Sequence, residues 1–516
     1  MRLPFPTAIS VPKATMFAAV LFAVEQVQHT DLRFSLLVFS FIILSVFTFN
    51  VAGGFSRPSG AYVFFYALLT VFVAVTWKAV LGEPAQTRLQ DPIVVLALYN
   101  ASMVGILLAI LATQVLLAGR PSFSTWIGAD QIDLANAALG CLILSILLSA
   151  FGFLNISGTR QIVSALNQIN FFGSFAVILG TLNAIRKSGG RHTLDLTSGV
   201  ALGFSILYGI IGFSKQGMFG PLVGWLLVVA SSRVNLRRIH VISIAVGAVV
   251  AYTVLVPFSQ IGRDVIPEDS GFSARLAVIG ALLSQPLELR SEYAQDLAIN
   301  DEQSAAAGFV NSYYNSSQGF IDRLSIMPAD DTLINFTERG HILGPAPLAY
   351  DIINWVPHFI MPDKEKYDIE GGRYSNHGNY YSHEMGTIGV DDTTTGISFS
   401  STAEAFHLGG WQGLPLLALP IWFALFFVSD FLCGDPRRAP WGLFLIAYFA
   451  HAANEGSLGA ILGWLWLGTF GQVMIMFFCL RFAPILGMLL SGHADRRKAG
   501  ARTRPIPLPT VVQPRA

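Results

Sequence analysis

Charged residues are scarce in this chain. Asp, Glu, Lys and Arg make up 12% of the 516 residues, about half the share of an ordinary soluble domain. Hydrophobic residues make up 53%, and the formal net charge is zero. So few charges cannot cover the surface of a soluble protein of this length. The composition is typical of a protein that lies mostly within a membrane.

Cysteine and the common enzyme signatures are also rare or missing. The three cysteines, Cys141, Cys433 and Cys479, all lie in or beside apolar segments, so disulfides do not hold the polar part of the chain. The sequence contains no phosphate-binding loop, dinucleotide fingerprint, Ser/His/Asp signature or HExxH motif. Their absence argues against a pump driven by ATP bound within this chain.

Long apolar segments dominate what is present. Most of them approach the roughly 20 residues with few charges that cross a hydrocarbon core of about 30 Å, and the first, at 14–24, is short. We therefore predict an all-α polytopic membrane protein with about 12 transmembrane helices. They are expected near residues 14–24, 34–52, 60–82, 92–118, 134–154, 165–185, 196–213, 216–232, 239–258, 413–432, 440–453 and 457–480.

The positive charges fix the expected orientation. Alternate short connections hold clusters of Lys and Arg, for example Arg186 with Lys187 and Arg437 with Arg438, whereas the connections between them hold single charges such as Arg33 and Arg88. Because basic connections stay in the cytoplasm, both termini are expected there and the longest connection is expected outside. This pattern agrees with twelve spans.

Four regions follow from this reading. Residues 1–258 form an N-terminal membrane bundle, 259–410 one large exterior loop, 411–490 the C-terminal spans, and 491–516 a disordered basic and Pro-rich cytoplasmic tail. The loop holds 21 Asp and Glu against 8 Lys and Arg, which argues against binding nucleic acid. We expect an amphipathic helix in residues 273–311, then an ordered irregular segment with short helices.

Isolated cations on the expected exterior side are candidate anion-binding groups. Lys215 lies in the turn Phe213-Ser-Lys-Gln-Gly217, Arg160 lies on a neighbouring turn, and Arg323 lies within the loop. Arginine and lysine at such positions can bind phosphate. A snorkelling Lys215, or an ion pair of Arg323 with Asp322 or Asp330, is the alternative.

His383 and Glu404 are the candidate acid and base groups of the loop. An imidazole or carboxylate beside a sugar hydroxyl can take its proton. His377, His383 and Glu384, followed by Asp391 and Asp392, superficially suggest a metal site. Their spacing matches no compact zinc pattern, so we expect neither a metal nor another cofactor. A purely structural role remains open for each residue.

Two stretches of the loop carry a resemblance to a known family. They are Trp355-Val-Pro-His-Phe-Ile-Met-Pro362-Asp-Lys364 and, after the Ser/Thr-rich segment from Thr394 to Ser401, Ala403-Glu404-Ala-Phe-His-Leu-Gly-Gly410-Trp411-Gln-Gly413. With the topology, they resemble the bacterial O-antigen and exopolysaccharide repeat-unit polymerases. The turn Ser214-Lys215-Gln-Gly217 is similar to that family's Ser-Arg-x-Gly turn. His358 stands where the family more often has arginine.

The resemblance implies a C-type membrane glycosyltransferase of the bacterial inner membrane with a large periplasmic loop. Such an enzyme joins polyprenyl-pyrophosphate-linked oligosaccharides, without a nucleotide sugar or an obligatory metal, beside a chain-length regulator and a flippase. It implies that Lys215, Arg160 and Arg323 contact pyrophosphate, that Lys364 and His358 contact substrate, and that Glu404 or His383 is the base.

Three other functions fit parts of the sequence. An O-antigen ligase shares the architecture and needs the same groups. A transporter or lipid flippase would place ionisable residues at the membrane midplane and would show matching halves. The predicted spans are nearly free of charge and no internal repeat is evident, which disfavours this class. A scaffold for polysaccharide assembly would need the loop but neither Arg323 nor Glu404.

Overall fold

The computed structural model describes residues 2–128, 131–153, 171–236, 238–265, 272–284, 313–316, 321–354, 363–367, 377–389 and 397–491, with a few isolated positions between them. The described residues form helices and turns, and their one recorded β-contact is an isolated bridge between Arg2 and Asn235. Three of the predicted features fall outside these residues: Arg160, His358 and the tail beyond residue 491.

Five helices within the described residues are long and apolar enough to cross a membrane. They are Leu32–Ser56, Pro58–Leu81, Pro92–Leu117, Leu414–Cys433 and Leu458–Leu489. Shorter apolar helices accompany them, among them Leu134–Ala150, Leu196–Ile211 and Pro440–Ala450. The chain is therefore an all-α, multi-pass membrane protein, as predicted. The total of about twelve spans stays a prediction.

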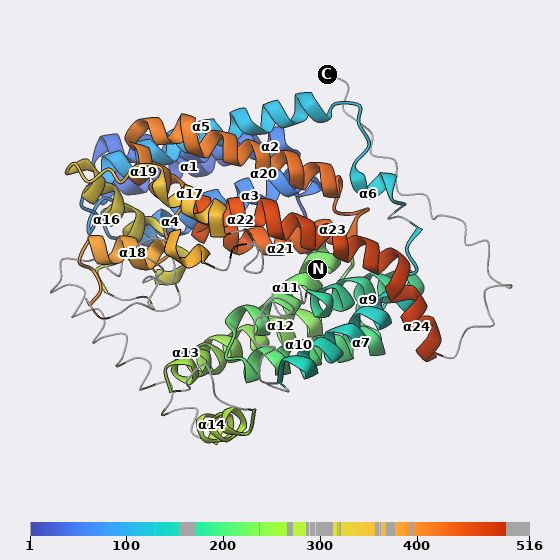
Figure 1. The fold of residues 1–516 in the computed structure, drawn as a ribbon. Coiled ribbons are helices and arrows are strands. Elements are labelled where there is room, and N and C mark those ends of the chain that lie inside the picture. Colours follow the sequence, from blue (N-terminus) through green and yellow to red (C-terminus); the bar gives the residue numbers. More distant parts are fainter. Residues whose placement is uncertain are drawn as a thin grey trace.

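The first group of helices, which we call the main bundle, combines the first helices of the chain with later helices that follow the loop (Figure 1). Helix α2 packs on α1, α3 and α5, α20 packs on α5, and α21 packs on α3. The elements are α1 (Val11–Val27), α2 (Leu32–Ala52), η1 (Gly54–Ser56), α3 (Pro58–Ala67), η2 (Leu68–Phe72), α4 (Val73–Leu81), α5 (Pro92–Leu117), α6 (Phe123–Trp126), η9 (Leu414–Ala418), α20 (Leu419–Cys433), α21 (Pro440–Glu455), α22 (Leu458–Gly463), η10 (Trp464–Gly468) and α23 (Thr469–Phe477).

The second group, the side bundle, comes from the middle of the chain and from its last helix (Figure 1). Helix α7 packs on α9 and α24, and α10 packs on α9 and α11. The contacts of α21 with α9 and α11 join this group to the main bundle. Its elements are α7 (Leu134–Phe153), α9 (Phe172–Ser188), α10 (Leu196–Ile211), α11 (Lys215–Ser231), α12 (Arg238–Val250), η4 (Ala251–Leu255), α13 (Val256–Val265), α14 (Phe272–Ser284), η11 (Phe478–Phe482) and α24 (Ala483–Ser491).

The predicted loop forms short helices, as expected for its second half. These are η5 (Asp322–Leu324), α16 (Met327–Glu338), α17 (Ala346–Asn354), η6 (Lys364–Tyr367), α18 (His377–Glu384), α19 (Ser401–Gly409) and η8 (Gly410–Gln412). The helix expected in residues 273–311 begins as α14, with Leu276 and Leu283 exposed. Most of the rest of that segment lies outside the described residues.

Two adjacent aspartates dock α16 onto one end of the main bundle. The carboxylate of Asp331 accepts hydrogen bonds from the backbone N–H groups of Gln90 and Asp91, at 2.6 and 2.8 Å, where α5 begins. Asp330, fully buried, accepts from the Tyr99 hydroxyl at 2.8 Å and from the Ser400 N–H at 2.8 Å. These bonds join α16, α19 and α5 into one unit.

Candidate functional site

Helix α19 (Ser401–Gly409) contains most of the second stretch of the family resemblance, which runs from Ala403 in the loop to Gly413 at the next span. The Ser400 side chain caps it by accepting a hydrogen bond from the Ala403 N–H. It ends in a tight turn, where Gly410 has a φ of +56° and a side chain on Gly413 would collide with the backbone oxygen of Ala405. This turn folds the chain from the loop directly into the span that contains α20.

Glu404 lies at the centre of α19 and is fully buried. Its Oε1 accepts a hydrogen bond from the Tyr381 hydroxyl at 3.0 Å and lies 3.1 Å from Nδ1 of His377. Its Oε2 accepts a hydrogen bond from the backbone N–H of Leu458, the first residue of α22. A buried carboxylate needs such donors because burial otherwise disfavours its charge.

His377 connects Glu404 to a second carboxylate. Its Nε2 lies 3.2 Å from Oδ1 of Asp351, a residue of α17. The side chain of His377 is 11% exposed and that of Asp351 is 22% exposed, whereas Glu404 is inaccessible. Three separate segments of the loop, α17, α18 and α19, thus meet at one imidazole. We call Asp351, His377, Glu404 and Tyr381 the acid/base cluster.

One face of α18 holds this arrangement together. His377, Tyr381 and Glu384 follow one another at the i, i+4 and i+7 positions, so they share a side of the helix. Glu384 Oε2 lies 3.6 Å from Nε2 of His407 on α19, and Nδ1 of His407 lies 2.9 Å from the Thr337 hydroxyl on α16. The polar face of α18 therefore contacts α19 twice.

The surroundings shift the pKa values of His377 and Tyr381. Burial opposes protonation of His377, but hydrogen bonds and charge from Asp351 and Glu404 prevail and raise its pKa to about 10. The imidazole is consequently a cation at neutral pH, with both nitrogens donating. Burial and the neighbouring Glu404 raise the pKa of Tyr381 well above its usual range. Tyr381 is therefore a fixed, neutral donor.

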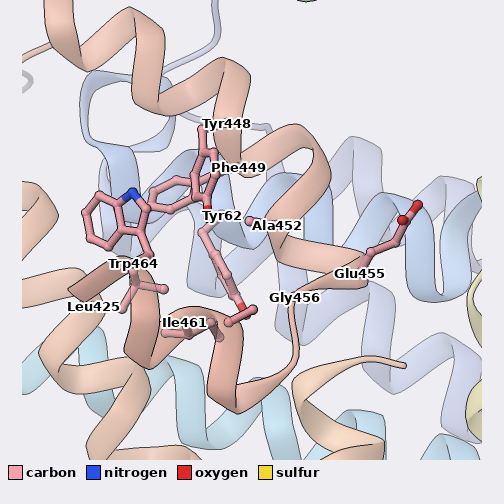
Figure 2. Close-up of a pocket in the computed structure, with 10 residues that line it drawn as sticks. Tyr62, Leu425, Tyr448, Phe449, Ala452, Glu455, Gly456, Ile461 and Trp464 are labelled. Atoms are coloured by element: carbon pink, nitrogen blue, oxygen red, sulfur yellow. The ribbon is translucent and has the colours of Figure 1, made fainter. Parts of the chain in front are cut away.

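A cavity of about 100 Å³ lies beside the start of α22 (Figure 2). Aromatic rings line it, with Tyr448, Phe449 and Trp464 grouped together and Glu455 lying apart from them at the end of α21. Its wall includes Gly456, just before α22, and Ala460 and Ile461 in the first turn of that helix. These residues flank Leu458, whose backbone N–H donates a hydrogen bond to Glu404. The cavity is apolar apart from Glu455 and the Tyr hydroxyls.

The predicted site residues fall in several places. Glu404 belongs to the acid/base cluster. His383 lies on α18 but outside the face that meets Glu404, and it is half-buried. Arg323 is exposed in η5. Lys364 in η6 donates to the backbone oxygen of Val356 at 3.1 Å. These assignments stay predictions.

Lys215 lies in the side bundle, on a helix that packs on α9, α10 and α21. It is the first residue of α11, and Ser214 caps that helix by accepting from the Gly217 N–H at 3.1 Å. The preceding Phe213 has a φ of +49°, and its carbonyl oxygen accepts a hydrogen bond from Nε of Arg263 at 2.9 Å. Lys215 and Arg263 therefore flank the same turn.

The sequence did not reveal that His377 and Tyr381 contact Glu404, or that Asp351 contacts His377. The spacing of His377, Tyr381 and Glu384 was the available signal, because it places three polar groups on one face of a helix. Asp351 had no local signal, since its contact with His377 joins segments that are distant along an irregular stretch. In the part of the chain that the structure describes, no group of three or more His, Cys, Asp and Glu residues has an arrangement suited to a metal ion.

Comparison with known proteins adds no relative. No family model matches the chain, and neither a curated protein nor a solved structure shows significant similarity to it.

Proposed function

We propose that this protein is a membrane glycosyltransferase that joins polyprenyl-pyrophosphate-linked oligosaccharide units into O-antigen or exopolysaccharide, on the periplasmic side of a bacterial inner membrane. One observation carries the proposal. The loop builds a carboxylate–imidazole–carboxylate cluster from three segments and docks it at the end of an apolar helical bundle. Such a cluster suits proton removal from a hydroxyl at a membrane surface.

The reaction needs two kinds of group. The acceptor sugar hydroxyl must lose a proton as it attacks the anomeric carbon of the donor, and the acid/base cluster supplies carboxylates for that role. The leaving lipid pyrophosphate carries negative charge that cations can stabilise. Arg323 and Lys364 in the loop, and Lys215 at the start of α11, are our candidates for that contact, together with Arg160 and His358.

Two buried charges of the main bundle, Lys78 and Asp430, favour an enzyme over a transporter. Lys78 donates to the backbone oxygens of Pro84 and Thr87 in the turn after α4. Asp430 accepts from both the N–H and the hydroxyl of Ser59 at the start of α3. Asp430 thus satisfies the first turn of α3 and Lys78 closes the turn between α4 and α5, whereas a transported ion or proton would need ionisable groups near the midplane.

The deciding experiment is deletion of the gene, with the length of the surface polysaccharide read on a gel that resolves single repeats. We expect the ladder to collapse to one repeat on its acceptor, with lipid-linked single repeats accumulating. Complementation with the Glu404→Gln variant should fail, whereas Glu338→Gln, an exposed glutamate of α16, should restore the ladder. Full-length polymer stranded on its lipid would instead identify a ligase, and an unchanged ladder would reject both functions.

A further inference from the structure

We propose that α17 and the turn before it lie in the membrane leaflet on the side of the loop, as an interfacial helix whose exposed residues contact lipid. These exposed residues, Ile342, Ala346, Ala349 and Ile352, are called the α17 strip. Only the spans and the packing of α17 support this role, so it is independent of the proposed glycosyl transfer.

Helix α17 has a packed side and an exposed side. Ala346, Ala349 and Ile352 follow one another at three-residue steps, so they share one side of the helix. Ile352 is 51% exposed. Pro347 and Leu348, on the other side, are buried. The helix is therefore amphipathic in its packing, but the side that is left uncovered is apolar.

The packed side of α17 lies against the first turn of a membrane span. Helix α17 packs on α22 (Figure 1), which opens the span Leu458–Leu489. No charged residue follows Leu458 until Arg481, so the apolar stretch that can cross the hydrocarbon core begins at this turn. The contact is close, because a side chain on Gly459 would come within 1.9 Å of Oδ2 of Asp351. Helix α17 therefore lies at the level where this span enters the membrane.

The turn before α17 touches the start of a second span. A side chain on Gly410 would lie 3.5 Å from Cδ1 of Ile342, and the span Leu414–Cys433 begins just after Gly410. Trp411 is 49% exposed, and Leu416, within the span, is 67% exposed. An exposed tryptophan beside the start of a span is typical of the interface between headgroups and hydrocarbon. Ile342 therefore lies at the membrane boundary as well.

Lipid is the partner that fits the α17 strip. From residue 342 to residue 352, every exposed residue is apolar, whereas a loop helix that faces water presents polar side chains there. Both ends of the segment touch points where spans enter the membrane, so the strip continues the lipid-facing surface of Leu416. Its residues gain contact with hydrocarbon there, as those of an interfacial helix do.

This placement also fixes the height of the acid/base cluster. Asp351 belongs to α17, His377 contacts Asp351, and Glu404 contacts His377. A helix held in the leaflet by its exposed side thus carries the cluster on its packed side. The cluster consequently lies at the membrane surface and not in the water above it.

The test measures contact with lipid and with water at single residues of the full-length protein, in vesicles of phosphatidylethanolamine and phosphatidylglycerol. A nitroxide label is attached to Ala346→Cys, Ala349→Cys or Ile352→Cys. Its collisions with oxygen, which concentrates in hydrocarbon, are compared with its collisions with a water-soluble nickel chelate. The native cysteines are buried, and wild-type protein taken through the labelling measures any signal from them. The two alanine variants add a single sulfur atom, so they test the strip even where Ile352→Cys unfolds the protein.

Leu416→Cys is the reference for lipid, and Ser316→Cys, at an exposed position of the loop, is the reference for water. We expect labels on the α17 strip to favour oxygen as the label at Leu416 does, at a depth of about 5–10 Å. Collisions with the nickel chelate as frequent as at Ser316 would show that the strip faces water and would overturn the proposal. Protection from both reagents would show that protein covers the strip, which overturns it equally. Since the measurement needs no substrate, its failure leaves the proposed function untouched.

Discussion

The main bundle and the side bundle hold their helices together by different means. In the main bundle and the loop helix α19 docked on it, polar side chains bond across helices: the Tyr66 hydroxyl lies 2.6 Å from that of Thr402, which in turn donates to Ser102 at 2.9 Å. In the side bundle, backbones approach closely at small residues. A methyl group on Gly140 of α7 would lie 2.1 Å from the backbone oxygen of Ala483 in α24.

The difference matches what each region has to do. Small residues let apolar helices gain van der Waals contact where lipid gives no hydrophobic driving force. Such contacts fix a separation but leave the helix rotation weakly determined. Hydrogen bonds are directional, so the bond between Tyr66 and Thr402 and the bond from the Ser400 N–H to Asp330 fix the orientation of α19. The Tyr99 hydroxyl in turn holds Asp330. Directional bonds thus occur where Glu404 has to be positioned.

The largest expected effect would break the side bundle. Gly140→Ala places a methyl group against the α24 backbone, so α7 and α24 must separate. We expect a loss of several kcal/mol, enough to abolish the folded protein. Thermal unfolding of the detergent-solubilised protein, followed by fluorescence-detected gel filtration, measures it. Gly199→Ala should be neutral or slightly stabilising, and equal melting of the two variants would show that the close approach is unimportant.

A smaller effect is expected where the loop helices α16 and α19 dock onto the main bundle. Asp330→Ala leaves the Tyr99 hydroxyl and the Ser400 N–H buried without their acceptor. At about 1–3 kcal/mol for each unsatisfied group, docking of α16 and α19 should weaken by roughly 3 kcal/mol or more. Limited proteolysis of the loop, with the spans still folded, would reveal it. A loop as resistant as in Glu338→Ala would contradict the directional role of these bonds.

The smallest effect is a pH dependence of the same docking. Burial raises the pKa of both Asp330 and Asp331 to about 6, despite the hydrogen bonds that they accept. The docked state therefore binds more protons than the undocked state between about pH 4 and pH 6, so docking weakens as pH rises through that window. For each group the change is at most about 3 kcal/mol. Hydrogen exchange of α16 at pH 4.5 and 7 measures it, and a slope unchanged in Asp330→Asn would exclude Asp330 as a source.

The helices could be predicted because their signals are local. The span expected at 92–118 is observed as Pro92–Leu117, where a proline opens the helix and the apolar pattern runs unbroken. The span expected to end at 258 continues through α13 to Val265, because Ser259 and Arg263 hydrogen-bond to the carbonyl oxygen of Phe213. Polar residues that find a partner across a turn extend a helix beyond its apolar pattern.

The candidate site was only partly predictable. Glu404 stood out because it lies just before a glycine-rich return to the membrane. Its partners did not, since His377 and Leu458 reach it, and Asp351 reaches His377, from three segments whose relative position no local pattern encodes. A single sequence identifies residues that are chemically competent, whereas burial and long-range contact decide which of them act together.

The bonds between α3 and α19 also impose an order on biosynthesis. The Tyr62 and Ser401 hydroxyls, 3.5 Å apart in the folded protein, are separated by 339 positions in the chain. At about 5–20 residues per second, the ribosome needs roughly 20–70 seconds to deliver the second after the first. During that interval the inserted early spans expose hydroxyls whose partners do not yet exist. The nascent membrane protein must therefore wait, half-assembled in the bilayer, for its late segments to arrive.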